Sequence, residues 1–232
     1  MKTWPARAHI LQSRPLQSRV LQARVLQALA MLALSISTAA ASAAAVPLES
    51  ARALAAGLAR AGRAEATLSW SVPGPPGSAA TALHGRLAVE PPDLARLDVT
   101  GTGERITLRS DGGEWLQPRL KQFVRLTPRH AVAAMRWWRL LAGAGGGGGG
   151  VATERRLGPG RYRLIVPATP EAEADSADVW LDSRGLPARL VLADGMGGQS
   201  SYRLAGWRFT RAQGGTAFRL EVPPGMETVE LP

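Results

Sequence analysis

The chain has 232 residues, a formal net charge of +10 and no cysteine. Without cysteine it forms no disulfide and carries no lipid through a thiol, so the fold must be held together by core packing alone. Only two of the 28 basic residues are Lys, and the Arg residues are scattered along the sequence. That distribution excludes a nucleic-acid-binding footprint and predicts only weak attraction to anionic surfaces.

Residues 1–45 are typical of a secretory signal peptide. Basic residues fill the start with no acidic residue before Glu49, an Ala-rich apolar stretch covers residues 28–45, and small residues precede Val46. A signal of this kind is cleaved on export. An uncleaved membrane anchor is the alternative, but Ala, Ser and Thr make the stretch weakly hydrophobic. Residues 46–232 would then keep 23 basic and 18 acidic residues, a net charge of +5.

Apolar side chains recur at three- and four-residue spacing from Leu48 to Leu58, which predicts an amphipathic helix over residues 48–63. Gly57 weakens this helix, and Gly62 stands where a C-cap is expected.

From Ala66 the apolar period changes to two. Clean alternation predicts strands over residues 66–71, 85–90, 95–100 and 105–109. Parity places one apolar set on a single sheet face: Leu87, Val89, Leu97, Val99, Ile106 and Leu108. The opposite face receives Arg86, Arg96, Asp98, Arg105, Thr107 and Arg109. These strands should form an antiparallel meander with one apolar and one solvated face. Residues 110–124 continue it as strands separated by tight turns, the first at Asp111-Gly112-Gly113.

Residues 128–142 predict a second helix with an aromatic block at Trp137-Trp138. The glycine-rich loop 143–150 follows and is expected to be flexible. Further strands are predicted over residues 162–166, 177–181, 188–192, 201–204, 207–210 and 217–222. Roughly ten strands and two helices predict an α+β fold. We expect a strongly curved antiparallel sheet, an unclosed β-barrel, whose concave apolar face is covered by the helices. It forms one domain over residues 46–232.

No catalytic residue, metal site or cofactor is predicted. His84 and His130 are 46 residues apart, and neither has a second ligand at metal spacing. No Gly-x-Ser-x-Gly nucleophile elbow is present. We therefore expect a protein that is not an enzyme.

Tryptophan is unusually frequent, and six Trp remain in residues 46–232: Trp70, Trp115, Trp137, Trp138, Trp180 and Trp207. For any single Trp, ordinary core packing is the simpler explanation. As a set on a curved sheet and its covering helix, they suit an apolar cavity that would bind acyl chains. Parity and helix spacing predict its lining as Trp70, Leu87, Val89, Leu97, Val99, Ile106, Leu108, Trp115, Met135 and Trp138.

Five segments, taken in order, carry a resemblance to a known family. They are residues 85–92, 110–122 with Ser-Asp-Gly, Trp-Leu and Leu-Lys-Gln, 162–167, 194–202, and 218–226 with its Val-Pro-Pro-Gly-Met ending. In this order they resemble the LolA family of periplasmic carriers of outer-membrane lipoproteins. The resemblance implies a periplasmic monomer that binds lipoprotein acyl chains. It also implies two protein partners, an inner-membrane lipoprotein-releasing ABC transporter and an outer-membrane lipoprotein acceptor, and no nucleic acid.

One position departs from the family's pattern. The family commonly has Arg-Pro after the Gly-x-Leu-x-Val strand, and that Arg helps to hold the lid. This chain has Pro91-Pro92 there, preceded by Glu90. Because proline has no hydrogen-bond donor, Pro91 cannot make that contact. Two alternatives keep the fold: a sensor of envelope stress like the RseB regulators, or a carrier of a glycolipid, hopanoid or polymer precursor.

Overall fold

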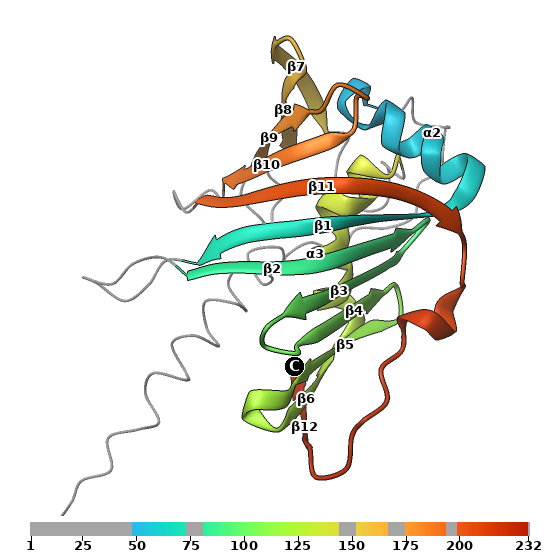
Figure 1. Cartoon of the computed structure of the whole chain (residues 1–232), viewed down its shortest axis with the longest axis vertical. Coiled ribbons are helices and arrows are strands. Elements are labelled where there is room, and N and C mark those ends of the chain that lie inside the picture. Colours follow the sequence, from blue (N-terminus) through green and yellow to red (C-terminus); the bar gives the residue numbers. More distant parts are fainter. Residues whose placement is uncertain (1–47, 73–80, 144–151, 167–174, 194–198, 232) are drawn as a thin grey trace, which may run out of the picture.

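One sheet of twelve strands dominates the structure, a computed structural model that describes residues 48–72, 81–143, 152–166, 175–193 and 199–231. The predicted signal peptide and all of the Gly-rich loop except Gly143 lie outside these ranges. The strand order is β12-β6-β5-β4-β3-β2-β1-β11-β10-β9-β8-β7. All pairings are antiparallel except β12 with β6, which is parallel (Figure 1).

The element bounds are as follows. The strands are β1 Gly62–Val72, β2 Thr81–Glu90, β3 Leu94–Thr100, β4 Arg105–Arg109, β5 Gly112–Gln117, β6 Gln122–Leu126, β7 Thr153–Gly158, β8 Arg161–Val166, β9 Asp175–Leu181, β10 Pro187–Ala193, β11 Gln199–Arg211 and β12 Glu227–Leu231. The helices are η1 Glu49–Ala51, α2 Arg52–Ala61, η2 Pro118–Leu120, α3 Pro128–Leu141 and η3 Gly215–Phe218.

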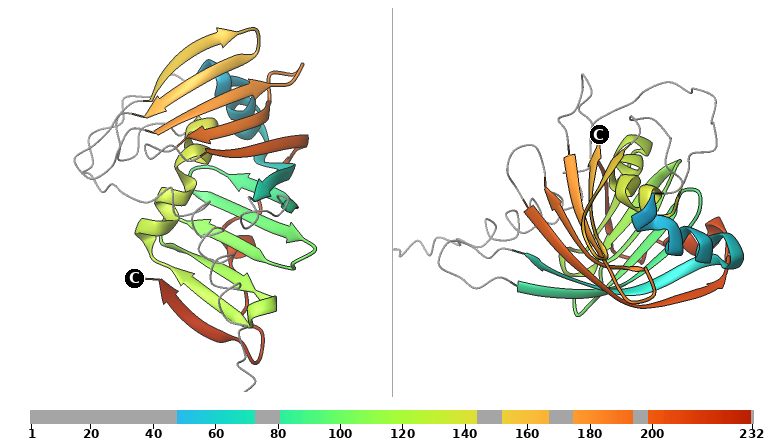
Figure 2. Two further views of the ribbon diagram at one scale, coloured as in Figure 1. Left: turned by 90° about the vertical axis from the view of Figure 1, so that its left-hand side faces the viewer. Right: turned by 90° about the horizontal axis from the view of Figure 1, so that it is seen from above.

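The sheet does not close. β12 and β7 stand at its two ends and each has one neighbour, while the strands between them curve around α3 (Figure 2). This confirms the predicted unclosed, curved antiparallel sheet. Period-two alternation located most strands because each has one apolar and one polar face.

Four details of the strand prediction were wrong. The strands expected at 201–204 and 207–210 are one long strand, β11. The segment expected as a strand at 217–222 begins with the last two residues of η3 and then forms neither helix nor strand. The edge strands β7 and β12 were missed. Both are short and carry charged side chains, as edge strands usually do, so they lack the apolar alternation that reveals inner strands.

The two helices pack on the apolar face of the sheet. α2 contacts β1 and β11, and α3 contacts β4, β5 and β6. Gly62 ends α2 in the left-handed region with φ of 91°, and its N–H donates to the carbonyl of Leu58, so the predicted C-cap is confirmed. Pro128 begins α3, where its missing N–H costs nothing.

The outer face of β2–β5, predicted to be solvated, is partly covered by the C-terminal segment, which we define as residues 212–226. This segment leaves β11, crosses the sheet through η3 and reaches the free edge of β6 (Figure 1). Phe218 of this segment is fully buried against the sheet, and Thr107 and Arg109 on β4 are buried beneath the segment. The prediction failed because parity identifies the face of a residue but not what later covers it.

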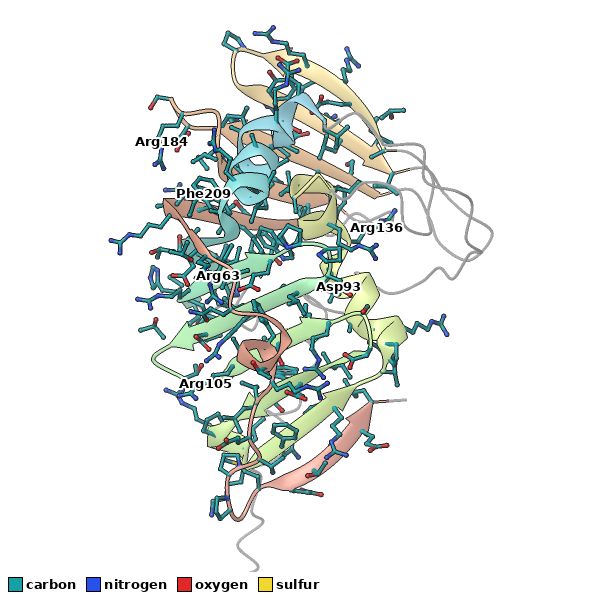
Figure 3. All side chains as sticks on the ribbon, turned by 90° about the vertical axis from the view of Figure 1, so that its right-hand side faces the viewer. Arg63, Asp93, Arg105, Arg136, Arg184 and Phe209 are labelled. Atoms are coloured by element: carbon teal, nitrogen blue, oxygen red, sulfur yellow. The ribbon has the colours of Figure 1, made fainter. Side chains whose placement is uncertain are left out.

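Glu90 fastens the beginning of this segment to the sheet. Its buried carboxylate accepts hydrogen bonds from the backbone N–H groups of Gln213 at 2.9 Å and Gly214 at 3.0 Å. Arg63 Nη1 donates to the same carboxylate at 3.1 Å and to Gln213 Oε1 at 2.9 Å (Figure 3). A buried charge is tolerated only when it is paired and hydrogen-bonded, and here both conditions hold.

A second set of contacts fastens the segment farther along. Arg109 Nη1 donates to the carbonyl of Phe218 at 2.8 Å, and Arg109 Nη2 donates to Glu114 Oε1 at 3.2 Å. Glu114 Oε2 in turn accepts from the backbone N–H of Leu220 at 2.6 Å. The guanidinium of Arg63 also lies 5.4 Å from the centre of the Phe218 ring. The polar residues of this face therefore bind the chain's own backbone.

Replacing Gly57 by Ala should destabilise the protein. The ring of Phe209 on β11 fills the space where a Cβ would stand, and Figure 3 shows Phe209 beside α2. Helix propensity alone would favour Ala by about 1 kcal/mol. Overpacking should reverse this and lower the free energy of unfolding by about 1–3 kcal/mol in urea denaturation. The double variant Gly57→Ala/Phe209→Ala should lose less than the two single losses combined. A stabilised Gly57→Ala would contradict the packing described here.

Candidate functional site

The apolar face of the sheet is built from rows of side chains that face one another across neighbouring strands. In one row the register pairs Ala66 with Leu87, Leu87 with Leu97, and Leu97 with Ile106. Ile106 then pairs with Trp115 on β5. Directly paired residues share a face, so this row confirms the predicted parity of β2, β3 and β4.

A second row extends the same face across the centre of the sheet. Leu83 pairs with Trp70, Trp70 with Tyr202, and Tyr202 with Leu190. This row joins β1 to β11, two strands that lie far apart in the sequence. The apolar face therefore continues from the first meander into the second half of the chain.

Helix α3 lies over this face. Ala131, Ala134, Trp137 and Leu141 are buried at three- and four-residue spacing. Next to this stripe, Met135 is also buried and Trp138 is partly buried against the core. The cation of Arg136 lies 5.9 Å from the centre of the Trp137 ring.

A cavity of about 150 Å³ remains between α3 and the sheet. Its lining is mostly apolar and comes from β1–β4, β10, β11, the β3–β4 turn and α3. The lining residues are Leu68, Trp70, Thr81, Leu83, Leu87, Ala95, Arg96, Leu97, Val99, Thr102, Glu104, Ile106, Leu108, Ala134, Trp137, Trp138, Leu190, Leu192 and Tyr202.

Most of the predicted lining residues meet in this cavity: Trp70, Leu87, Leu97, Val99, Ile106, Leu108 and Trp138. Val89 and Met135 lie instead on a cavity of about 10 Å³ next to the β2–β3 turn, where α3 packs against the strands. Trp115 is buried in the core with 1% of its surface exposed. The assigned sheet face is right for Val89 and Trp115, but α3, which carries Met135, packs against this face. A role in ligand binding for all ten stays a prediction.

Other cavity residues were missed by the sequence analysis, among them Leu68, Leu83, Trp137, Leu190, Leu192 and Tyr202. Residues 188–192 and 201–204 were recognised as strands, but their pairing partners were not. The pairing of β11 with β1 brings them to the cavity, and alternation along a single strand carries no information about that pairing.

Two polar side chains stand out in this lining. Glu104 Oε2 accepts a hydrogen bond from Trp115 Nε1 at 3.1 Å, so the carboxylate is anchored to the core while it reaches the cavity. Tyr202 lies on the opposite side, on β11, and burial raises the pKa of its phenol above the usual 10.0.

The described residues contain no group of three His, Asp or Glu side chains placed to hold a metal ion. His130 Nδ1 lies 2.8 Å from Thr127 Oγ1 at the start of α3, away from the cavity lining. In the same part of the chain, no helix is long and apolar enough to cross a membrane.

No family model matches this chain, and no curated protein matches it significantly. Solved structures do resemble it. An uncharacterised conserved protein from Thermus thermophilus has a TM-score of 0.45 and 15% identity, covering 79% of this chain and 98% of its own. A second, from Nitrosomonas europaea, has a TM-score of 0.39 and 10% identity, covering 76% and 99%. It is a LolA superfamily protein.

A third similar structure is a domain ascribed to outer-membrane lipoprotein sorting, from Vibrio parahaemolyticus. Its TM-score is 0.40 at 10% identity, and the match covers 72% of this chain and 95% of that domain. At TM-scores of 0.45 and less, these likenesses decide nothing about function.

Both tyrosines should resist ionisation in the folded protein. Burial is the main cause of the raised pKa of both phenols. For Tyr162, the carboxylate of Glu49 raises the pKa further. A raised tyrosine pKa contributes stability below pH 10.0, and this contribution is lost as the pH rises through the folded value. Absorbance at the tyrosinate band should therefore appear above pH 10.0 and accompany unfolding. Half-ionisation at pH 10.0 in a folded sample would contradict the burial of both phenols.

Proposed function

We propose that this protein is a periplasmic carrier that holds the acyl chains of lipoproteins in the cavity beneath α3. The observation that carries the proposal is the cavity itself, an apolar space bounded by two rows of cross-strand pairs and a tryptophan-bearing helix. Transport between an inner-membrane lipoprotein-releasing transporter and an outer-membrane acceptor belongs to the same proposal. Catalysis has no part in it.

The size of the cavity constrains how a ligand would enter. A volume of 150 Å³ is known to hold a benzene molecule in a protein core, which is far less than a long acyl chain. Trp137 and Trp138 on α3 form one wall, so displacement of this helix would enlarge the space. We infer that loading requires α3 to move away from the sheet.

The energy of such binding suits a carrier. Burial of about ten methylenes contributes roughly 8 kcal/mol before the entropic costs of binding are subtracted. That gross value corresponds to a dissociation constant of about 1 μM. The entropic costs make the actual affinity weaker than this gross value, so a bound acyl chain can be passed on to a partner with a larger apolar surface.

A cavity-filling variant tests the proposal. Ala134 lies on the cavity wall, so Ala134→Phe should occupy the space and reduce bound ligand at least five-fold, while filling preserves stability. Ala59→Phe adds the same bulk to an exposed position of α2 and should leave the amount of bound ligand unchanged. The measurement is native mass spectrometry of protein recovered from cells without detergent.

Three outcomes of that measurement are distinct. Adduct masses of acylated protein or peptide, lost only in Ala134→Phe, would support a lipoprotein carrier. Free phospholipid or glycolipid adducts with the same pattern would keep the cavity and change the cargo. Wild-type protein without adducts would overturn the proposal and favour a sensor that binds protein.

Glu104 should influence which head group the cavity accepts. Its carboxylate would stabilise a cationic head, and Glu104→Gln should weaken binding of dodecylammonium about five-fold, or about 1 kcal/mol for a partly exposed charge. Binding of dodecanoate, which has the same tail length, should not weaken. Glu227→Gln on β12, away from the cavity lining, is the matched control. Tryptophan fluorescence measures both affinities, and equal losses for the two amphiphiles would refute a role for this carboxylate.

A further inference from the structure

The outer face of β7–β11, opposite the cavity, gathers arginines that are scattered in the sequence. The register pairs Arg161 with Trp180, Trp180 with Arg189, and Arg189 with Arg203. Arg163 lies two residues after Arg161 on β8 and therefore on the same face, and it pairs with Arg155 on β7. We call this set the outer arginine surface: Arg155, Arg161, Arg163, Trp180, Arg189 and Arg203.

Its charge is strongly unbalanced. Among the described side chains that these pairings bring to the surface, the one carboxylate is that of Asp178. Arg163 Nε donates to it at 2.6 Å and Arg161 Nη2 at 2.9 Å, and this pairing lowers the pKa of Asp178. Arg155, Arg189 and Arg203 are all exposed. A net positive field therefore covers this face.

Trp180 orders part of the surface. The guanidinium carbons of Arg161 and Arg189 each lie 4.7 Å from the centre of its ring, one from either neighbouring strand. Stacking on an aromatic ring fixes the plane of a guanidinium group. Pre-ordered side chains lose less conformational entropy when they bind, so these two arginines are prepared to receive an anion.

We propose that the outer arginine surface docks the protein on anionic phospholipid bilayers, with guanidinium groups binding lipid phosphates. Guanidinium binds phosphate in a bidentate manner, and tryptophan is favoured at the boundary between lipid and water. The two cavities described above are not lined by this surface, so it offers an extended array of cations instead of a groove for a peptide. This proposal does not depend on what fills the cavity beneath α3.

Co-sedimentation with lipid vesicles tests the proposal. The protein is recovered from cells, and its N-terminal residue is identified by mass spectrometry. One vesicle set is pure phosphatidylcholine. In the other, about a third of the lipid is phosphatidylglycerol, the anionic probe. Each arginine near an anionic surface contributes about a five-fold factor in partitioning. The variant Arg189→Gln/Arg203→Gln should therefore bind the anionic vesicles about 25-fold less.

The matched control removes two charges from the opposite side of the sheet. Arg52 and Arg129 are exposed in the first turns of α2 and α3, so Arg52→Gln/Arg129→Gln has the same net charge as the test variant. It should retain wild-type vesicle binding. Equal losses in the two pairs would overturn the proposal, because net charge alone would then explain the attraction. Binding that is absent, or equally strong on neutral vesicles, would also overturn it.

Asp178→Asn should strengthen vesicle binding, whereas the arginine variant weakens it. Removing this carboxylate frees Arg161 and Arg163, so anionic vesicles should bind about five-fold more tightly, with the fold verified by circular dichroism. Inorganic phosphate and polyglutamate serve as soluble competitors. Competition by phosphate at millimolar concentration would show that single phosphate groups suffice and would contradict bilayer docking. Polyglutamate binding that the test variant loses, with vesicle binding unchanged, would assign the surface to an acidic protein instead.

Discussion

The row from Leu87 through Leu97 and Ile106 to Trp115 commits four neighbouring strands to a common apolar face. A closed barrel would bury such a face inside itself, but this sheet ends at β12 and β7 and stays open. Some other element must cover it. Helix α3 does so with Ala134, Trp137 and Leu141, and the space it leaves unfilled is the cavity. Incomplete closure, helix cover and cavity are thus consequences of one constraint.

The two faces of the sheet differ in polarity and therefore in how they are stabilised. The inner face is apolar and must be covered by complementary side chains. The tryptophans of α3 and the leucines of β1–β4 pack against each other there and line the cavity. The outer face carries charge and needs partners. On the side of β2–β5 those partners are the backbone groups of the C-terminal segment, held by Glu90 and Arg109. On the side of β7–β11, Asp178 pairs with Arg161 and Arg163, while Arg155, Arg189 and Arg203 are exposed.

The sequence predicted what depends on neighbours within one strand or helix. Gly62 ended α2 as expected, and the parity of β2–β4 was right, because caps and alternation are local properties. It did not predict that β11 pairs with β1, which brings Leu190 and Tyr202 to the cavity. Nor did it show that Glu90 would be buried by a segment more than a hundred residues later. Such pairings depend on the closure of long loops, and no local pattern encodes them.

The arrangement of β12 has a consequence for the newly made chain. β12 lies parallel to β6, and it reaches that edge only after the C-terminal segment has crossed the outer face. When the chain emerges from its N-terminus, at synthesis or on export, residue 126 appears about a hundred residues before residue 227. Until then β6 has an unpaired edge, and Arg109 lacks the carbonyl of Phe218. Unpaired strand edges are sites of aggregation. The edge of β6 is therefore open to strands of other molecules until the last residues of the chain have emerged.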